Sequence, residues 1–171
     1  MAVEYSLEFS ILEAGDDLSG FSCRNAVFTR YLTERAGQDM RRRAATVVLM
    51  RRSGEAAVIG YYTISAFGIA LADLNPTMQK RLPRYPVVPS VLIGRLAVDE
   101  RYEGKGLGRI LLVDALERAA RLDVAVWGVV VDAIDEAAAR FYQKFGFIGV
   151  ASDPNRLVLP LQTYLKARES R

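Results

Sequence analysis

The feature that most constrains the fold is an apolar run, SVLIGRLAVD (residues 90–99), followed at once by the glycine-rich stretch RYEGKGLGR (residues 101–109). A continuous apolar run of this length is typical of a strand that is buried within a sheet. Apolar residues then recur at helical spacing from Gly106 to about Leu122, and a second apolar run, VAVWGVVVDA (residues 124–133), follows. A strand, a helix and a strand in this order predict two parallel strands joined by a crossover helix.

The patterns on either side of this unit predict antiparallel strands and further helices. Residues 44–51 and 56–71 are predicted to form a hairpin, with other strands at residues 6–13, 147–150 and 156–161. Ser19 is predicted to cap a helix through residues 25–36 that Gly37 interrupts, and Asp135 to cap a helix that Gly146 ends. Residues 75–89 contain four prolines and are predicted to be loop with one helical turn. The fold class that follows is α/β, with a mixed and mostly antiparallel central sheet.

Length and composition set broad limits on the kind of protein. The chain has 171 residues and no internal repeat, so we expect one domain over residues 1–171. No apolar run reaches the roughly 18 residues of a membrane span, and the first twenty residues hold five acids and no base, unlike a secretory signal. Cys23 is the only cysteine, which leaves no intramolecular disulfide. We therefore expect a cytoplasmic protein.

The chain contains no histidine. This excludes catalytic triads that use a histidine base, and one cysteine cannot supply the ligands that a zinc site would then need. We expect no metal cofactor. Any chemistry must rely on carboxylates, tyrosine, backbone amides or a bound cofactor.

The three glycines of the RYEGKGLGR stretch match neither common nucleotide-binding motif. Their spacing, Gly104-x-Gly106-x-Gly108, is not the G-x-G-x-x-G of the Rossmann turn, and no Ser or Thr follows Lys105 as in a Walker loop. Glycines nevertheless allow successive N–H groups to point into one concave nest, and a helix that begins near Gly106 adds its positive end. The stretch is either a pyrophosphate cradle or a flexible turn between strand and helix.

Arginine is unusually abundant and unevenly distributed. The chain has 19 arginines and 4 lysines, and residues 24–52 hold eight arginines against two acids. Arginine suits bidentate contact with phosphate, so the segment predicts either a nucleic-acid surface or a solvated helix face.

The strand, the Arg101-x-x-Gly104-x-Gly106 loop and the amphipathic helix together resemble the acetyl-CoA site of the GNAT acetyltransferases. The strand VWGVVVDA and the helix DEAAARFYQKFGF resemble the closing segment of that family. The resemblance implies the GNAT fold, with helices flanking a sheet whose parallel pair splays apart, and acetyl-CoA as the acetyl donor. The residues implied to bind acetyl-CoA lie at the end of the strand and in the loop: Leu96, Ala97, Val98, Glu103, Gly104, Lys105, Gly106, Leu107, Gly108 and Arg109.

Within this family, almost the whole chain resembles the TacT/AtaT-like toxins of type II toxin–antitoxin systems. The segments that carry this resemblance are residues 21–50, 82–108, 139–147 and 154–161. The resemblance implies acetylation of the α-amino group of aminoacyl-tRNA, which blocks translation, and a homodimer neutralised by a ribbon-helix-helix antitoxin. One departure lies in FSCRN (residues 21–25), where the family has an acid after the phenylalanine and Gly or Ser before the asparagine.

The resemblance also assigns a role to Tyr142. Helical spacing alone places this tyrosine in the core, whereas the family uses a tyrosine at this point as the general acid that protonates the leaving thiolate. No general base stands out, the candidates being Asp99, Glu100 or a chain of waters. Residues predicted to contact the tRNA backbone are Arg41, Arg42, Arg43, Lys80, Arg81 and Arg84. Arg95 lies in an apolar strand, so it is predicted either to form a structural ion pair or to face the acceptor pocket.

Two other functions compete with the toxin interpretation. An acetyltransferase for a small-molecule amine or a protein N-terminus would be expected to have an acidic acceptor cleft, whereas this sequence offers arginines. The third interpretation is a ligand-sensing or DNA-associated module that binds acetyl-CoA without turnover, and Tyr142 together with the intact Gly104-x-Gly106 loop counts against it.

Overall fold

A computed structural model describes residues 6–171 and shows two compact units. The first unit comprises the described residues up to Ser65 together with Gly94–Ala115, and the second comprises Ala66–Ile93 with Leu116–Arg171. Glu4, one of the five N-terminal acids, lies outside the described residues. None of the helices in residues 6–171 is both long enough and apolar enough to cross a membrane.

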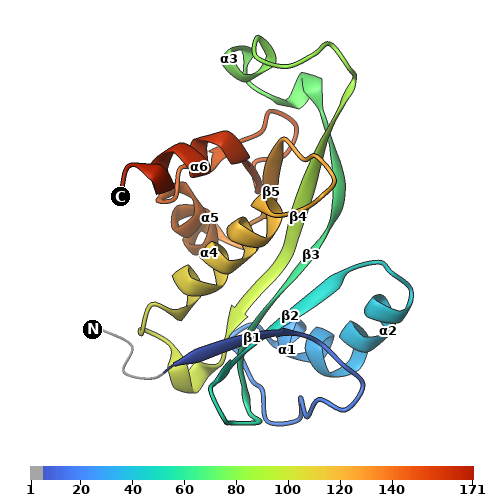
Figure 1. Ribbon diagram of the computed structural model, residues 1–171, viewed down its shortest axis with the longest axis vertical. Helices are drawn as coiled ribbons and strands as arrows, with labels where there is room; N and C mark the ends of the chain where they lie inside the picture. The colour runs from blue at the N-terminus through green and yellow to red at the C-terminus, as the bar shows by residue number, and fades with distance from the viewer. Residues whose placement is uncertain (1–5) are drawn as a thin grey trace. The chain divides into compact units, whose positions relative to one another are not determined.

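Seven strands form one mixed sheet in the order β1-β2-β3-β4-β5-β7-β6 (Figure 1). The strands are β1 (Leu7–Ile11), β2 (Thr46–Arg52), β3 (Val58–Ala70), β4 (Val87–Val98), β5 (Gly128–Asp132), β6 (Ile148–Gly149) and β7 (Arg156–Pro160). β4 and β5 pair in parallel from Ser90↔Gly128 to Ile93↔Val131, whereas β1–β2, β2–β3, β5–β7 and β6–β7 are antiparallel. The predicted α/β class, with one parallel pair in a mixed sheet flanked by helices, is confirmed.

The helical segment of the first unit differs from the prediction at both ends. Its cap is Asn25, whose side chain accepts hydrogen bonds from the N–H groups of Val27 (2.9 Å) and Phe28 (3.3 Å), while the Ser19 hydroxyl bonds Asp17. Gly37 does not interrupt the helix. The chain passes from α1 (Ala26–Arg30) through a π-helical turn, η1 (Tyr31–Arg35), directly into α2 (Ala36–Arg41).

An aromatic cluster lies at the centre of the first unit's core. Tyr61 of β3 is fully buried, stacks against Tyr31 at 6.4 Å between ring centroids, and meets the edge of Phe21 at 5.5 Å. Its hydroxyl donates to the Phe28 carbonyl at 2.6 Å, which satisfies the one polar group that the ring buries. Cys23, predicted to be a small buried residue, belongs to the same core.

The crossover helix α4 (Leu107–Ala120) begins in the first unit and ends in the second. Five of its residues, spaced so as to share a face, are almost fully buried: Leu107, Leu111, Ala115, Leu116 and Ala119. Ile110, predicted to face the core, is half-buried. Since the first residue of the helix is anchored in the core, the loop before it is held at a fixed position.

The second unit contains α3 (Pro76–Gln79), α5 (Glu136–Gln143) and α6 (Leu161–Glu169). In Figure 1, α3 lies at the tip of the long ribbon formed by β3 and β4. The prediction missed α6, where Tyr164 and Arg168 both donate hydrogen bonds to Glu117 of α4. The apolar run of residues 124–133 predicts a core position for Trp127, and this prediction is wrong, because Trp127 precedes β5 and is half-buried.

Candidate active site

The glycine-rich loop joins β4 to α4 through a short 3-10 turn, η3 (Glu100–Tyr102). Gly104 and Gly106 adopt left-handed backbone conformations, with φ of 75° and 78°. A Cβ added to either residue would meet nothing within 4 Å, so no packing contact requires these glycines. The backbone conformation requires them instead, because an L side chain is strained at such a φ.

Beside this loop lies a cavity of about 370 Å³. The lining residues within the predicted site are Val98, Glu103, Gly104, Gly106, Leu107 and Gly108. Leu107 buries its side chain in the core, so it can offer the cavity only its backbone. The first N–H groups of a helix have no partner within the helix, and those of α4 begin at this cavity. Backbone donors at the positive end of a helix make the cavity suitable for an anion such as a pyrophosphate.

Two lining residues were not among the predicted site residues. Arg24 and Tyr102 both border the cavity, and the Arg24 guanidinium forms an ion pair with Glu103 at 2.6 Å. Arg24 is 79 positions from Glu103 and its side chain is 86% exposed. Exposed pairs of this kind are weak, so an anion in the cavity can compete with Glu103 for the guanidinium. The available signal was the departure in FSCRN, where the resemblance leads us to expect Gly or Ser and this sequence has Arg24.

The other predicted donor-binding residues do not line the cavity. Leu96 is half-buried and Ala97 is buried on β4, whereas Lys105 and Arg109 are exposed. The Lys105 ammonium lies 5.5 Å from the centre of the Tyr102 ring. Roles for these four residues in binding acetyl-CoA stay predictions.

Asp99 fixes the turn that precedes the glycine loop. Its side chain is 1% exposed and accepts hydrogen bonds from the Ser22 N–H (3.1 Å), the Arg101 N–H (2.9 Å) and the Arg101 guanidinium (2.9 Å). Burial alone would raise the pKa of the Asp99 carboxyl, but these hydrogen bonds and the Arg101 charge hold it below its ordinary value. A buried carboxylate so committed has a structural role, which removes Asp99 from the candidate general bases. Glu100 remains exposed.

Tyr142 lies on α5 in the second unit. The cap of α5 is Asp135, as predicted, and accepts a hydrogen bond from the Ala138 N–H at 2.7 Å. The Tyr142 ring is 6% exposed and packs against Phe141 and Phe147, with centroids 5.2 and 5.5 Å away. Gly146, with φ of 96°, ends this segment as predicted.

The chemistry of Tyr142 suits a proton donor. Burial, with a smaller contribution from the charge of Asp132, raises the pKa of its phenol above the ordinary 10.0. The phenol is therefore protonated at neutral pH. Among residues 6–171, none is a hydrogen-bond partner of the Tyr142 hydroxyl.

The predicted tRNA-binding arginines fall in two sets, which differ in their surroundings. Arg41, Arg42, Arg43 and Arg84 are exposed. Arg95 is half-buried, and its guanidinium lies 3.5 Å from the centre of the Tyr31 ring. The predicted alternative of an ion pair is wrong within the described residues, because the partner of Arg95 is an aromatic ring.

The Tyr31 ring beneath Arg95 is itself held in place. Its hydroxyl donates to Asp39 at 2.8 Å, and burial followed by this hydrogen bond raises its pKa to about 12. Tyr31 begins the π-helical turn η1, and such turns are frequent at functional sites. Arg95 is thus a half-exposed cation on a rigid platform.

Comparison with known proteins identifies the family of this chain. The sequence profile of the Acetyltransferase (GNAT) family matches residues 17–147, which is more than half of the chain. The chain belongs to the GNAT acetyltransferase family. In this GNAT acetyltransferase, the matched residues include the Gly104-x-Gly106 loop, α4, β5 and the whole of α5 with Tyr142.

Three matches show which members of this family the chain resembles. A protein named tRNA-acetylating toxin, from Mycobacterium tuberculosis, is 31% identical over 157 residues, which cover 91% of this chain and 92% of the relative. A structure of AtaT complexed with acetyl-methionyl-tRNAfMet superposes with a TM-score of 0.87 at 30% identity, covering 95% of this chain and 99% of that chain. A tyrosine-to-phenylalanine mutant of the AtaT toxin, bound to acetyl-CoA and the C-terminus of the antitoxin AtaR, superposes with a TM-score of 0.79 at 26% identity, covering 97% and 99%. The GNAT fold of this chain is therefore that of the acetyltransferase toxins.

Proposed function

We propose that this GNAT acetyltransferase transfers the acetyl group of acetyl-CoA to the α-amino group of aminoacyl-tRNA and thereby acts as a toxin that blocks translation. The observation that carries the acceptor assignment is the similarity along almost the whole chain to a protein named tRNA-acetylating toxin. AtaT, whose structure contains acetyl-methionyl-tRNAfMet, is similar over 95% of this chain. Similarity of this extent includes the helical segment and the loops around the fold, beyond the donor-binding core that all acetyltransferases of the family share.

The glycine loop supports acetyl-CoA as the donor. The pyrophosphate of acetyl-CoA needs several N–H donors on one concave surface, and Gly104 and Gly106 leave open the space that Cβ atoms would take. The N–H groups of Leu107 and Gly108 begin α4 beside the same cavity. Arg24 adds the one cationic side chain among the lining residues.

Two groups on this chain would then assist the transfer. When the amine attacks the thioester carbonyl, negative charge develops on its oxygen, and we assign the stabilising N–H donors to the backbone of Leu96, Ala97 and Val98. The C–S bond then breaks, and the leaving thiolate takes its proton from the Tyr142 phenol, which is protonated at neutral pH. The surplus proton of the attacking amine passes to water, and the Tyr142 phenolate regains a proton from water before the next turnover. The α-amine of an aminoacyl ester is much less basic than the amine of a lysine side chain, so this step needs no dedicated base.

The exposed arginines are assigned to the tRNA backbone. Arg41, Arg42, Arg43 and Arg84 can contact phosphates without reading the base sequence. Arg95 is held on the Tyr31 ring, which favours a fixed contact over a mobile one, and we assign it to the acceptor side of the reaction.

The partners and cellular setting form the remainder of the proposal. A toxin of this class is neutralised by an antitoxin, as AtaT is bound by AtaR, and we propose a ribbon-helix-helix antitoxin, a homodimeric toxin and a cytoplasmic location where tRNA is charged. We also propose that the two units act as one domain over residues 1–171. The strands β3 and β4 support this, because each runs through both units.

The decisive experiment compares two acceptors. The purified protein is incubated with labelled acetyl-CoA and either charged tRNA or the same tRNA after deacylation. Label on the charged tRNA alone identifies the aminoacyl amine as the acceptor. If neither RNA is labelled although acetyl-CoA binds, the tRNA assignment is wrong, and small amines and protein N-termini become the acceptors to assay.

A further inference from the structure

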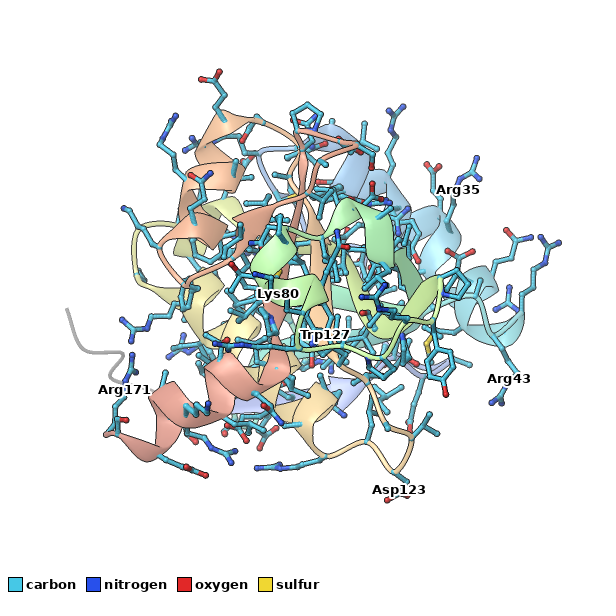
Figure 2. The ribbon with its side chains drawn as sticks, turned by 90° about the horizontal axis from the view of Figure 1, so that it is seen from above. Arg35, Arg43, Lys80, Asp123, Trp127 and Arg171 are labelled. Carbon is cyan, nitrogen blue, oxygen red and sulfur yellow. The ribbon has the colours of Figure 1, made fainter. Side chains whose placement is uncertain are left out.

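A second cavity, of about 190 Å³, lies in the second unit and shares no lining residue with the glycine loop. It is formed where α3, the residue before β5 and the first turns of α6 come together, and the lining residues that matter here are Met78, Arg81, Trp127, Gln162, Thr163 and Lys166. Figure 2 looks onto this end of the second unit and labels Trp127. Nothing in the proposed transfer reaction uses these side chains.

Trp127 is a fixed platform in this cavity. Its backbone N–H donates to the Pro89 carbonyl at 2.8 Å, and its carbonyl accepts from the Leu161 N–H at 2.9 Å, so the chain is held on both sides. The side chain packs against the apolar core of the second unit and is half-buried. Part of a large aromatic ring is thereby left facing the cavity.

The charge of the cavity is positive. Arg81 and Lys166 are exposed, and within residues 6–171 neither side chain forms an ion pair. No carboxylate is found among the lining residues that the structure describes, while Gln162 and Thr163 provide neutral hydrogen-bonding groups. The cavity therefore attracts an anion, with an aromatic surface alongside.

The size of the cavity limits what it can hold. Pockets for complete small molecules measure roughly 300–1,000 Å³, so about 190 Å³ suits one part of a larger ligand. An aromatic platform beside cations is the arrangement by which proteins bind single-stranded nucleic acid, stacking a base and neutralising its phosphate. An acidic peptide would use the cations but would leave the ring without a flat partner.

We propose that this cavity binds one unpaired nucleotide of the acceptor RNA, with the base stacked on Trp127 and the phosphate between Arg81 and Lys166. The identity of the RNA as tRNA rests on the proposed function. Bases of RNA are available for stacking where the strand is unpaired, so the single-stranded 3′ end of the acceptor is the segment that this cavity fits.

Trp127 is the only tryptophan of the chain, so its fluorescence reports on this cavity alone. The full-length protein is titrated with a single-stranded RNA tetranucleotide, and stacking is expected to quench the fluorescence to saturation. Neutralising one phosphate predicts a slope of about −0.7 for log K against log salt, and Arg81→Ala or Lys166→Ala is expected to weaken binding and to flatten this slope. Arg171→Ala is the matched control, since Arg171 is exposed and lies just beyond α6 but does not line the cavity.

A steady-state assay with charged tRNA separates this inference from the proposed function. Arg81→Ala and Lys166→Ala are expected to raise KM for charged tRNA while kcat and acetyl-CoA affinity stay unchanged. Trp127→Ala is expected to weaken RNA binding by about 5- to 140-fold, and Trp127→Tyr, which keeps an aromatic face, by much less. Because Trp127 contacts the core, the two cation variants decide the question if Trp127→Ala fails to fold.

The outcomes are distinguishable. Normal acetylation of charged tRNA, without quenching by RNA and without an effect of Arg81→Ala or Lys166→Ala, would overturn the nucleotide site and leave the proposed function standing. Quenching by an acidic peptide but not by RNA would also overturn it and would identify a protein partner. Saturable quenching by RNA that depends on Arg81 and Lys166, without any acetylation of charged tRNA, would support the site and refute the proposed function.

Discussion

Replacing Gly106 with alanine tests whether the glycine loop is a ligand cradle or merely a turn. An L residue in the left-handed region costs about 1–2 kcal/mol, and Gly106 has a φ of 78°. Since a Cβ there would contact nothing within 4 Å, no steric term is added in the free protein. The free energy of unfolding should fall by about 1–2 kcal/mol, which lowers Tm by about 2–8 °C in a chain of this length.

Gly54 provides a matched control in the turn between β2 and β3. Its φ is 80° and a Cβ there would also meet nothing within 4 Å, so Gly54→Ala should lower Tm by a similar amount. Of these two glycines, Gly106 lines the cavity and Gly54 does not. If acetyl-CoA binds there, the added methyl group and the relaxed backbone should disrupt one N–H contact to an anion, worth about 1.5–3 kcal/mol.

The assay pairs scanning calorimetry with titration calorimetry of acetyl-CoA. The two variants should lose similar stability, while the Kd for acetyl-CoA should rise about 10- to 140-fold in Gly106→Ala and stay unchanged in Gly54→Ala. Equal acetyl-CoA affinity in both variants and in the unaltered protein would refute the cradle. The glycines would then serve only the turn.

Three further predictions concern named side chains. Tyr142→Phe should lower kcat by about 100-fold or more with acetyl-CoA affinity unchanged, and a smaller loss of kcat in this variant would exclude Tyr142 as the general acid. Because the pKa of Tyr142 is raised above 10.0, kcat of the unaltered protein should show no loss from ionisation of this tyrosine between pH 7 and pH 9. Asp99→Asn should lower the free energy of unfolding by about 2 kcal/mol at pH 7. A carboxyl whose pKa is lowered by folding stabilises the fold above its ordinary pKa, and this stabilisation is lost as the pH falls through the pKa of the folded state. Denaturation curves should therefore show the difference between the two proteins shrinking as the pH falls below 3.8. Arg24→Ser should weaken acetyl-CoA binding by about 3- to 10-fold at low salt and by less at high salt, since the guanidinium is exposed; a salt-independent affinity would contradict a phosphate contact.

Signals confined to a few adjacent residues were interpreted correctly from the sequence. The Gly104-x-Gly106 turn, the Asp135 cap and the Gly146 terminus each depend on local backbone chemistry, and the structure has all three. The parallel pair was predictable because an apolar strand, a helix and another apolar strand leave little choice of topology. Ser19 and Asn25 are both good caps by type, and only the hydrogen bonds made by Asn25 distinguish them.

Features that depend on distant parts of the chain were missed. Gly37 did not stop the helix because a π-helical turn before it lets the chain continue against a packed core, where Ala36 is fully buried. Helix α6 has no side-chain cap and follows Pro160 directly, so its start carries no sequence signal. It is held instead by Glu117, which lies 47 positions from Tyr164 and 51 from Arg168.

The absence of histidine and the raised pKa of Tyr142 together define what chemistry the chain can perform. Without histidine, no side chain with an unperturbed pKa near neutrality is available to remove a proton and later return it. Of the two carboxylate candidates beside the loop, Asp99 is buried and bonded to Arg101 and Ser22, which leaves the exposed Glu100. A buried phenol keeps its proton at neutral pH and can donate it to the thiolate as the C–S bond breaks. The site therefore suits an amine that arrives already neutral, which favours the weakly basic amine of an aminoacyl ester over a lysine side chain.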